Sequence, residues 1–388
     1  MQIKHPAGFS RRAPLMFPCP RYRAPAGDIF AFSRIDRVIS LRGGEHAPRH
    51  RSDTRGTPEA RMKMLVTGAT GFIGSHLVKE LLLRKHSVRA LALPGEDAAW
   101  LEKAGVEVRR GDLLKPESLC GLCDGIDTVF HLAARVTDWG TRKQFYDAIL
   151  GATKNLIEEA AGRAKRFVYV SSVAALGCNR HLRGVKETDA PRKSGIPYND
   201  AKLDAEALVM KYNAAGKIAC TVVRPANVTG PGSVWVRDVL DKLKGFLPLV
   251  DGGAYSSSLV YIDNLVDGII LAGTKDIARG KYYHFRDDWT VSWKQYMTDL
   301  GALIGRKPAG SIPFGAAIAL AWICDRVCTP LHVRPPLTRF SVYITGRDYD
   351  VDTTLTRNEL GWRTRVPWEE AKQNIARWVR EEYSRRYS

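Results

Sequence analysis

The chain has 388 residues, of which 45% are hydrophobic, and its formal net charge is +18. This apolar content excludes a globally disordered protein. The positive charge favours an anionic cofactor, an anionic substrate or an acidic membrane face, although a well-solvated surface explains it equally well. The sequence contains no dedicated nucleic-acid-binding motif, so we expect no nucleic-acid partner. No apolar run reaches the ~18–20 residues that span a bilayer.

Residues 1–61 are rich in Arg, Pro and Gly and follow neither the period of a helix nor that of a strand. We interpret them as a disordered basic extension. Two alternatives stay open, a targeting peptide and an upstream extension of the reading frame. The second rests on Met62 and Met64, which stand at the start of the first expected strand.

The chain contains seven cysteines, and an odd number in a long chain argues against a disulfide framework. Cys120 and Cys123 form a single C-x-x-C pair, without the second pair or the two histidines that a zinc site needs. We therefore expect reduced thiols, a cytoplasmic location and no bound metal.

From Met62 onward, short apolar runs alternate with helical patterns. Strands are expected at residues 64–67, 87–93, 106–109, 127–131, 167–170 and 221–223, and helices from residue 75 and at residues 145–161 and 200–212. This alternation predicts an α/β fold with a doubly wound parallel sheet. All strands of such a sheet end at one edge, where its ligands bind.

A glycine-rich turn follows the first expected strand, with Gly68, Gly71 and Gly74 at a G-x-x-G-x-x-G spacing. Glycine permits the tight turn and the close approach of backbone to a phosphate. The following helix offers free N–H groups and a positive dipole end. A strand, this turn and a helix in succession predict a dinucleotide-binding Rossmann fold.

We divide the folded part of the chain at the point where the alternation breaks down. Residues 62–230 are the expected NAD(P)-binding domain, and residues 231–388 form a smaller substrate-binding region. Within the latter, residues from about 255 to 290 are expected to pack back on the sheet. Further helices are expected at residues 293–304 and 367–383.

The end of the second strand bears on the choice between NAD and NADP. A carboxylate at that place binds the ribose 2′-hydroxyl and repels a 2′-phosphate. Ala92 and Leu93 stand there instead, so neither cofactor is specified, and the missing carboxylate favours NADP. Asp112, after the third strand, is either an adenine-binding carboxylate or an ordinary strand-ending Asp.

Tyr198 and Lys202 are spaced i, i+4 on an expected helix and therefore share one face. A phenol with a pKa of ~10 is a poor proton shuttle at neutral pH, and a nearby ammonium lowers that pKa by stabilising the phenolate. Ser171 and Ser172 end the preceding strand at the same edge. A serine hydroxyl there can hydrogen-bond a reacting oxygen, so these residues predict a proton-transfer site.

Five motifs in this order resemble the extended short-chain dehydrogenase/reductases, the NAD-dependent epimerase/dehydratase family. They are Thr67-Gly68-x-x-Gly71-x-x-Gly74, His131-Leu-Ala-Ala134, Val170-Ser171-Ser172, Tyr198-x-x-x-Lys202 and Arg224-Pro225-Ala226-Asn227-Val228. The resemblance covers about residues 62–380. One departure is Ala148, which stands where the family usually has Asn, and it implies a rearranged hydrogen bond or water relay.

The resemblance implies a role for each matching residue. Tyr198 is the general acid/base, Lys202 holds the nicotinamide ribose and tunes Tyr198, and Ser172 polarises the reacting oxygen. The implied cofactor contacts are Gly68, Gly71, Phe72, Ile73 and Gly74 at the pyrophosphate, Asp112 and Leu113 at adenine, Ala133 along the cofactor, and Pro225 and Val228 near the nicotinamide.

Residues 335–342, 349–352 and 359–362 resemble the branch of 3β-hydroxysteroid and sterol-4-carboxylate dehydrogenases. The uncharged segment 312–324 lies where that branch often has a membrane-leaning helix, and it is either such a peripheral membrane helix or a core helix. A homodimer is a further expectation from the resemblance.

We therefore predict NAD(P)-dependent hydride transfer involving a secondary alcohol or ketone on a hydrophobic, steroid- or sterol-like 3β-hydroxy or 3-keto substrate. A nucleotide-sugar epimerase or dehydratase is the alternative. A non-catalytic cofactor-binding scaffold is a second alternative, against which the intact Ser172, Tyr198 and Lys202 argue.

Overall fold

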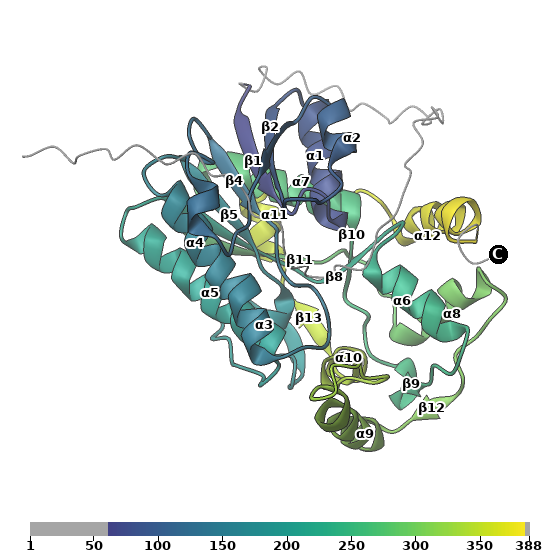
Figure 1. The fold of residues 1–388 in the computed structure, drawn as a ribbon. Coiled ribbons are helices and arrows are strands. Elements are labelled where there is room, and N and C mark those ends of the chain that lie inside the picture. The colour runs from purple at the N-terminus through teal and green to yellow at the C-terminus, as the bar shows by residue number, and fades with distance from the viewer. Residues whose placement is uncertain (1–60, 385–388) are drawn as a thin grey trace, which may run out of the picture. The chain divides into compact units, whose positions relative to one another are not determined.

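A seven-stranded sheet lies at the centre of residues 61–384, the part of the chain that the computed structural model describes (Figure 1). Its strands lie in the order β11-β7-β5-β4-β1-β2-β3, and every neighbouring pair is parallel. The strands are β1 (Lys63–Thr67), β2 (Ser87–Ala92), β3 (Glu107–Arg110), β4 (Thr128–His131), β5 (Arg166–Val170), β7 (Ala219–Pro225) and β11 (Lys281–Phe285). The predicted doubly wound parallel sheet is confirmed. The expectation for residues 1–61 falls, except for Arg61, outside the described residues.

Along the chain, β2 and β3 are added to the sheet on one side of β1, whereas the later strands are added on its other side, beginning with β4. Strand β1 pairs with β2 on one side and with β4 on the other. Thr67, at the end of β1, is level with Leu91 of β2 and with His131 of β4. In open α/β sheets, ligands bind outside the carboxyl ends of the strands at such a reversal. The topology therefore positions a binding site just beyond Thr67.

Helices cover both faces of the sheet, and the alternation of side chains along each strand divides the core between them. Met64 of β1 packs with the first pair of helices, whereas the next residue, Leu65, packs with the second pair. The first pair is α1 (Phe72–Leu83) and α7 (Ile262–Thr274), and the second is α4 (Ala152–Ala160) and α5 (Pro197–Ala214). The short helix α2 (Ala99–Lys103) connects β2 to β3.

The single helix expected at residues 145–161 is divided in the structure. Helix α3 (Arg142–Tyr146) leads into a π-helical turn at Asp147–Gly151, and α4 follows directly. Single π-helical turns inside α-helices often lie at functional sites. This turn contains Ala148, the position at which the sequence departs from its expected family pattern.

The part of the chain after Gly230 contributes to the sheet as well as to a separate group of helices. Strand β11 pairs with β7 in parallel, and α7 packs on the adjoining face. The boundary at residue 230 itself stays a prediction. The remaining helices are α6 (Val234–Leu243), α8 (Trp293–Ala302), α9 (Phe314–Cys328), α10 (Arg339–Thr345), α11 (Thr354–Leu360) and α12 (Trp368–Trp378), with a π-helical turn at Val379–Tyr383.

Three short parallel strand pairs organise this region. The first, β8 (Asn227–Thr229) with β10 (Leu259–Tyr261), follows directly on β7. The others are β9 (Leu249–Val250) with β12 (Ser311–Ile312) and β6 (Leu182–Val185) with β13 (Tyr349–Val351). The last pair joins the segment just before α5 to the C-terminal region.

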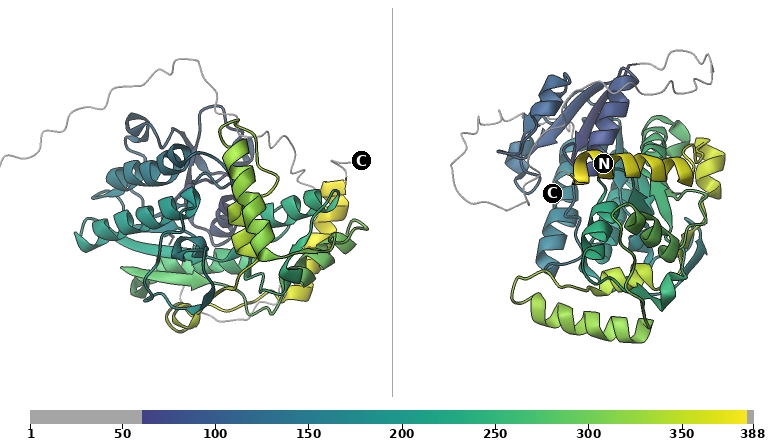
Figure 2. Two further views of the ribbon diagram at one scale, coloured as in Figure 1. Left: turned by 90° about the horizontal axis from the view of Figure 1, so that it is seen from below. Right: turned by 90° about the vertical axis from the view of Figure 1, so that its right-hand side faces the viewer.

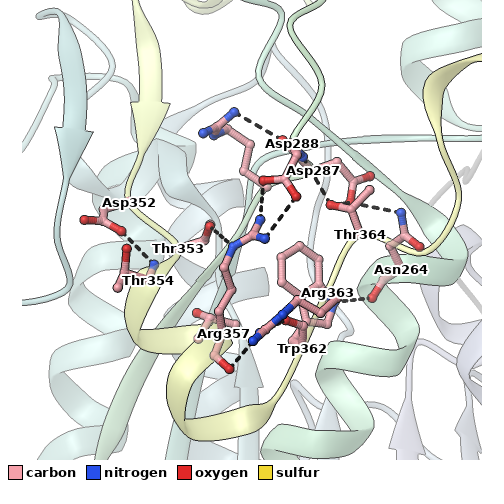
Figure 3. A network of polar contacts seen from close by, with 12 residues as sticks. Asn264, Asp287, Asp288, Asp352, Thr353, Thr354, Arg357, Trp362, Arg363 and Thr364 are labelled. Atoms are coloured by element: carbon pink, nitrogen blue, oxygen red, sulfur yellow. Dashed lines mark hydrogen bonds and ion pairs between the residues drawn. The ribbon is translucent and has the colours of Figure 1, made fainter.

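A network of polar contacts ties the C-terminal segment to α7 and to the loop after β11 (Figure 3). Buried Asp287 accepts hydrogen bonds from Asn264 of α7 at 2.9 Å and from Thr364 at 3.0 Å. Its neighbour Asp288 accepts a hydrogen bond from Nη1 of Arg357, on α11, at 2.9 Å. The network fixes the chain between α11 and α12 against the sheet.

Helix α9 lies at the periphery of the described part of the chain (Figures 1 and 2). Only Ala317 and Ala321 of this helix are buried, whereas Trp322 and Ile323 are 50% and 54% exposed. Within residues 61–384, no helix is long and apolar enough to cross a membrane.

Candidate active site

The glycine-rich turn after β1 leaves no room for a side chain at Gly68 or Gly74. Gly68 has φ +69°, and the carbonyl oxygen of Gly68 accepts the Gly71 N–H at 3.0 Å. A Cβ added to Gly74 would lie 2.0 Å from that same oxygen, far inside van der Waals contact. The chain can therefore turn this sharply into α1 only with glycine at these positions.

The N-terminus of α1 is open to an anion. The helix begins at Phe72, its N-cap residue Gly71 provides no side-chain cap, and its first turn contains no acidic residue. The first N–H groups of a helix and its positive dipole end favour a phosphate under these conditions. Ile73 and Gly74 lie in this first turn. These residues fit the pyrophosphate of a dinucleotide.

The other predicted cofactor contacts lie at or just beyond the ends of sheet strands, or in the short strand that follows β7. Ala133, after β4, packs against the glycine turn, since a Cβ on Gly68 would lie 2.9 Å from its nitrogen. Pro225 ends β7, and Val228 lies in β8. Asp112 and Leu113 follow β3. One oxygen of Asp112 accepts the Leu114 N–H at 2.9 Å, as in an ordinary Asx-turn. Their contacts with adenine and nicotinamide stay predictions.

A carboxylate that the sequence analysis missed lies at the end of β2. Glu96 Oε2 accepts the backbone N–H of Leu93 at 2.9 Å, and its Oε1 accepts the hydroxyl of Thr70 at 2.5 Å. Strand β2 ends at Ala92, one residue before the end read from the sequence, and Glu96 folds back to this strand end from four residues beyond. The Pro94-Gly95 pair that makes this turn was the available signal.

Ser172, Tyr198 and Lys202 come together beyond the end of β5. Helix α5 begins with Pro197, a residue suited to the first helical position, and so carries Tyr198 and Lys202 on consecutive turns. The Ser172 side chain lies close enough to Tyr198 to influence the pKa of its phenol. Lys202 Nζ donates to the carbonyl oxygen of Val170 at 2.8 Å. The predicted residues thus form one site, whose roles stay predictions.

The pKa values of Tyr198 and Lys202 are shifted in opposite directions from their usual values. Burial raises the pKa of Tyr198 to about 12, against the opposing effect of its hydrogen bond with Ser172. Burial lowers the pKa of Lys202 to about 7, although the charge of Glu206 acts in the other direction. These side chains do not by themselves produce the lowered pKa of Tyr198 that the spacing predicts, because the Lys202 ammonium is directed to Val170.

A buried ion pair attaches the turn of α5 that follows Lys202 to strand β7. Glu206 follows Lys202 by four residues, and Arg224 of β7 contacts both of its carboxylate oxygens, at 3.0 Å through Nε and at 2.6 Å through Nη2. Both side chains are at most 3% exposed. Arg224 stands in a motif that the sequence analysis used, but its partner was not recognised. The pair attaches the face of α5 that carries Lys202 to the sheet.

His131 joins the end of β4 to the elements on either side of it. Its Nδ1 lies 2.8 Å from Thr67 Oγ1 of β1, and its Nε2 lies 3.1 Å from Thr153 Oγ1 of α4. Burial lowers the pKa of His131 to about 3, and the nearby Lys202 acts in the same direction. A neutral imidazole therefore bridges these residues as a structural part of the site.

Two phenylalanine rings contact the ring of Tyr198. Phe145 of α3 lies 6.2 Å away and Phe340 of α10 lies 5.9 Å away between ring centroids, both edge to face. Phe340 comes from the C-terminal region, 142 residues after Tyr198 in the chain. No local pattern could have connected it with the site. The proton-transfer residues therefore lie beside apolar groups from both halves of the chain.

The comparisons with known proteins agree with this geometry. The sequence matches the NAD dependent epimerase/dehydratase family over residues 64–284. It is 32% identical to the 4-hydroxy-2-methyl-3-oxo-4-farnesyl-3,4-dihydroquinoline-1-oxide ketoreductase of Stigmatella aurantiaca, over 79% of this chain and 93% of the relative. It is 30% identical to sterol demethylase protein B of Methylococcus capsulatus, over 77% of this chain and 93% of the relative.

A solved structure gives the same result for the fold. The UDP-glucose 4-epimerase of Thermotoga maritima superposes with a TM-score of 0.67 at 21% identity, and the match covers 83% of this chain and all of the epimerase. At this identity, the likeness concerns the fold alone.

Proposed function

The chain belongs to the NAD-dependent epimerase/dehydratase family, and from this premise we propose that it reduces a hydrophobic ketone to a secondary alcohol, or catalyses the reverse reaction. One observation carries the proposal. Tyr198 lies close enough to Ser172 for that side chain to influence the Tyr198 pKa, while the Tyr198 ring contacts Phe145 and Phe340. A proton donor is thereby presented among apolar groups, as a site for an apolar carbonyl compound requires.

Tyr198 and Ser172 have different roles in the proposed ketone reduction. The nicotinamide, when bound, supplies the hydride for the carbonyl carbon. Tyr198 donates its proton to the carbonyl oxygen, and Ser172 hydrogen-bonds that oxygen as it gains charge. Because burial raises the pKa of Tyr198 to about 12, the phenol keeps its proton at neutral pH. This is the protonated form in which Tyr198 acts as an acid in the reductive direction, but a pKa this far above neutral makes the phenol a weaker acid than the spacing with Lys202 predicts.

The chain would hold the cofactor along the carboxyl edge of the sheet. Gly68, Gly71 and Gly74, with Phe72 and Ile73, would receive the pyrophosphate. Lys202 lies close enough to the end of β5 to bind the nicotinamide ribose as well as Val170. The elements on which these residues lie are already attached to one another through His131 and through the pair formed by Glu206 and Arg224.

A steroid- or sterol-like substrate fits this site better than a nucleotide sugar. The two relatives named above carry a farnesylated quinoline oxide and a sterol in their names, and both are at least 30% identical to this chain. The epimerase likeness is one of fold, at 21% identity. A nucleotide sugar would also bring a second pyrophosphate, whereas the side chains whose rings contact Tyr198 are the apolar Phe145 and Phe340.

A substrate panel tests the proposal. The full-length protein is given NADH or NADPH with 3-keto steroids and long-chain ketones, and oxidation of the nicotinamide is followed by its absorbance. We expect turnover with at least one apolar ketone. No turnover with any of them, together with tight binding of a UDP- or GDP-sugar, would replace the proposal with the epimerase alternative.

We also propose that α9 lies against a membrane surface, from which an apolar substrate would be taken. Leu320, Trp322, Ile323 and Val327 of this helix are 47% to 55% exposed, and Arg326 stacks on the Trp322 ring at 4.6 Å. A tryptophan beside a basic side chain is typical of residues at a membrane interface. The homodimer stays a prediction.

A further inference from the structure

The loop after β4 holds the guanidinium of Arg135 against an aromatic ring. The guanidinium carbon lies over the ring of Phe145, 5.6 Å from its centroid. A Cβ added to Gly140 would lie 3.2 Å from Arg135 Nη2, and Gly140 has φ +138°. Glycine at this position therefore leaves the room that the guanidinium occupies. The loop from Arg135 to Gly140 is thus shaped to keep this cation on the Phe145 ring.

Arg135 has donors that the described part of the chain does not use. Its Nε is buried and has no hydrogen-bond partner within residues 61–384. Asp138 is the nearest acidic residue along the chain, but it is ion-paired with Arg334 at 3.2 Å and accepts the Thr338 hydroxyl at 3.1 Å. A buried charged donor without a partner is costly, and a guanidinium presents five N–H donors in a planar fork. This fork therefore remains able to bind an anionic ligand.

Phe145 connects Arg135 to the proton-transfer site. Its ring lies beneath the guanidinium and also meets the ring of Tyr198 edge to face, with centroids 6.2 Å apart. One phenyl ring therefore separates the cation from the ring of the proton donor. The loop begins at the end of β4, on the edge of the sheet at which ligands bind. A ketone held at Tyr198 can reach Arg135 when it carries an anionic group a few bonds from its carbonyl.

We propose that Arg135 binds a carboxylate of the substrate, and that the ketone reduced at this site is a 3-oxo acid with an apolar chain. The inference rests on the proposed function and names the substrate class for its site. Carbon 3 accepts the hydride of the nicotinamide and the carbonyl oxygen accepts the proton of Tyr198, whereas the carboxylate stays ionised and unchanged. A planar guanidinium matches a carboxylate through two parallel hydrogen bonds.

The position of the carboxylate follows from the position of Arg135. In a 2-oxo acid, the carboxylate is bonded to the reacting carbon and would lie beside Tyr198 itself. One further carbon moves the charge away from Tyr198, toward the far side of the Phe145 ring. The apolar chain on the other side of the carbonyl would then contact Phe340, the second ring beside Tyr198. A long-chain 3-oxo acid therefore satisfies both the cation and the apolar surface of the site.

Oxidation of 3-hydroxy acids and of their methyl esters tests the inference. These alcohols report the reverse reaction, and the ester removes only the negative charge. The kcat/KM of the full-length protein is measured for both compounds over a series of chain lengths, with NAD+ and with NADP+, for the wild type, Arg135→Met, Arg135→Lys and Arg142→Met. Arg142 is the matched control, because it also stacks on a ring of α3, that of Tyr146 at 4.2 Å, but is exposed. Calorimetry gives the cofactor affinity of each variant.

We expect the wild type to favour the acid over its ester by about 10- to 100-fold in kcat/KM. Arg135→Met should remove most of this preference, Arg135→Lys should keep part of it because the charge remains, and Arg142→Met should keep all of it. Cofactor affinity in Arg135→Met should stay within about twofold of the wild type.

Two results would overturn the inference and leave the proposed function in place. One is a wild type that oxidises the ester as efficiently as the acid, and the other is an unchanged preference in Arg135→Met. A loss of cofactor affinity that accounts for the whole loss of kcat/KM would also overturn it, by assigning Arg135 to the cofactor. If the wild type oxidises neither compound at any chain length, the inference fails, and turnover of neutral ketones decides separately whether the proposed function fails as well.

Discussion

The edge of the sheet beside β1 and the region around α9 and α10 differ in how the chain builds them. At the sheet edge, the groups of the site lie in a turn or a helix that a short local sequence pattern marks, such as Gly68 between β1 and α1 or Tyr198 and Lys202 on α5. Around α10, the groups come from distant parts of the chain. Local sequence therefore specifies the first region, whereas the second depends on the completed fold.

Arg334 illustrates the second region. Its guanidinium contacts Asp138, in the loop after β4, at 3.2 Å and Asp238, on α6, at 2.8 Å. Thr338 adds a hydrogen bond to Asp138 at 3.1 Å. These contacts attach the segment before α10 to both halves of the chain and so position Phe340 beside Tyr198. Under the proposed function, a substrate surface assembled in this way can change without disturbing the cofactor site.

The largest expected effect comes from the proton donor at the sheet edge. Tyr198→Phe should lower turnover by about 10²–10⁴-fold, the usual contribution of general acid catalysis, and leave NAD+ affinity within about twofold. Steady-state kinetics and calorimetry measure the two quantities. Tyr146→Phe is the control, since that tyrosine hydrogen-bonds Asp204 at 3.0 Å and should be dispensable. Normal turnover in Tyr198→Phe would show that another residue donates the proton.

Breaking the buried ion pair between Glu206 and Arg224, which attaches α5 to the sheet, should destabilise the protein. Glu206→Gln leaves the charge of Arg224 buried without its partner, and we expect the free energy of unfolding to fall by about 3–5 kcal/mol. Urea unfolding measures it. The double variant Glu206→Leu with Arg224→Met should recover part of the loss, because both charges are then removed. Glu158→Gln, at an exposed pair on α4, should cost no more than about 1 kcal/mol.

The two regions also differ in what could be predicted from sequence. The glycine turn, the spacing of Tyr198 and Lys202, and the parallel sheet all follow from local patterns. Glu96 could not be assigned from the strand alone, because it lies four residues beyond the end of β2 and returns to that strand only through the turn at Pro94 and Gly95. Phe340 could not have been found in this way, since only long-range packing brings it to Tyr198.

Phe340 is the residue with which to separate the two regions experimentally. Phe340→Ala removes one edge-to-face ring contact, which is worth about 0.5–1.5 kcal/mol, and should raise the KM for an apolar ketone by about two- to tenfold. NAD+ affinity should not change. Phe246→Ala, at a side chain that is 78% exposed, is the control. A parallel loss of cofactor affinity in Phe340→Ala would mean that the two regions are not independent.

The last expected effect is a pH dependence of stability that arises from Lys202. Burial lowers its pKa to about 7 in the folded protein, whereas an unfolded chain has a Lys pKa of ~10.4. Between these two values, the unfolded state binds a proton that the folded state does not bind. Wild-type stability should therefore rise with pH across this window, by at most about 1.4 kcal/mol per pH unit. Below pH ~7 both states are protonated, and the contribution is constant.

Lys202→Met isolates this contribution, because it keeps a long side chain and removes the charge. The variant should exceed the wild type in stability most clearly below pH ~7, and the difference should narrow as the pH rises toward ~10. Urea unfolding at a series of pH values measures the difference. Lys211→Met, at an exposed position on the same helix, should show no such trend. A difference between Lys202→Met and the wild type that does not vary with pH would show that Lys202 keeps its charge inside the fold.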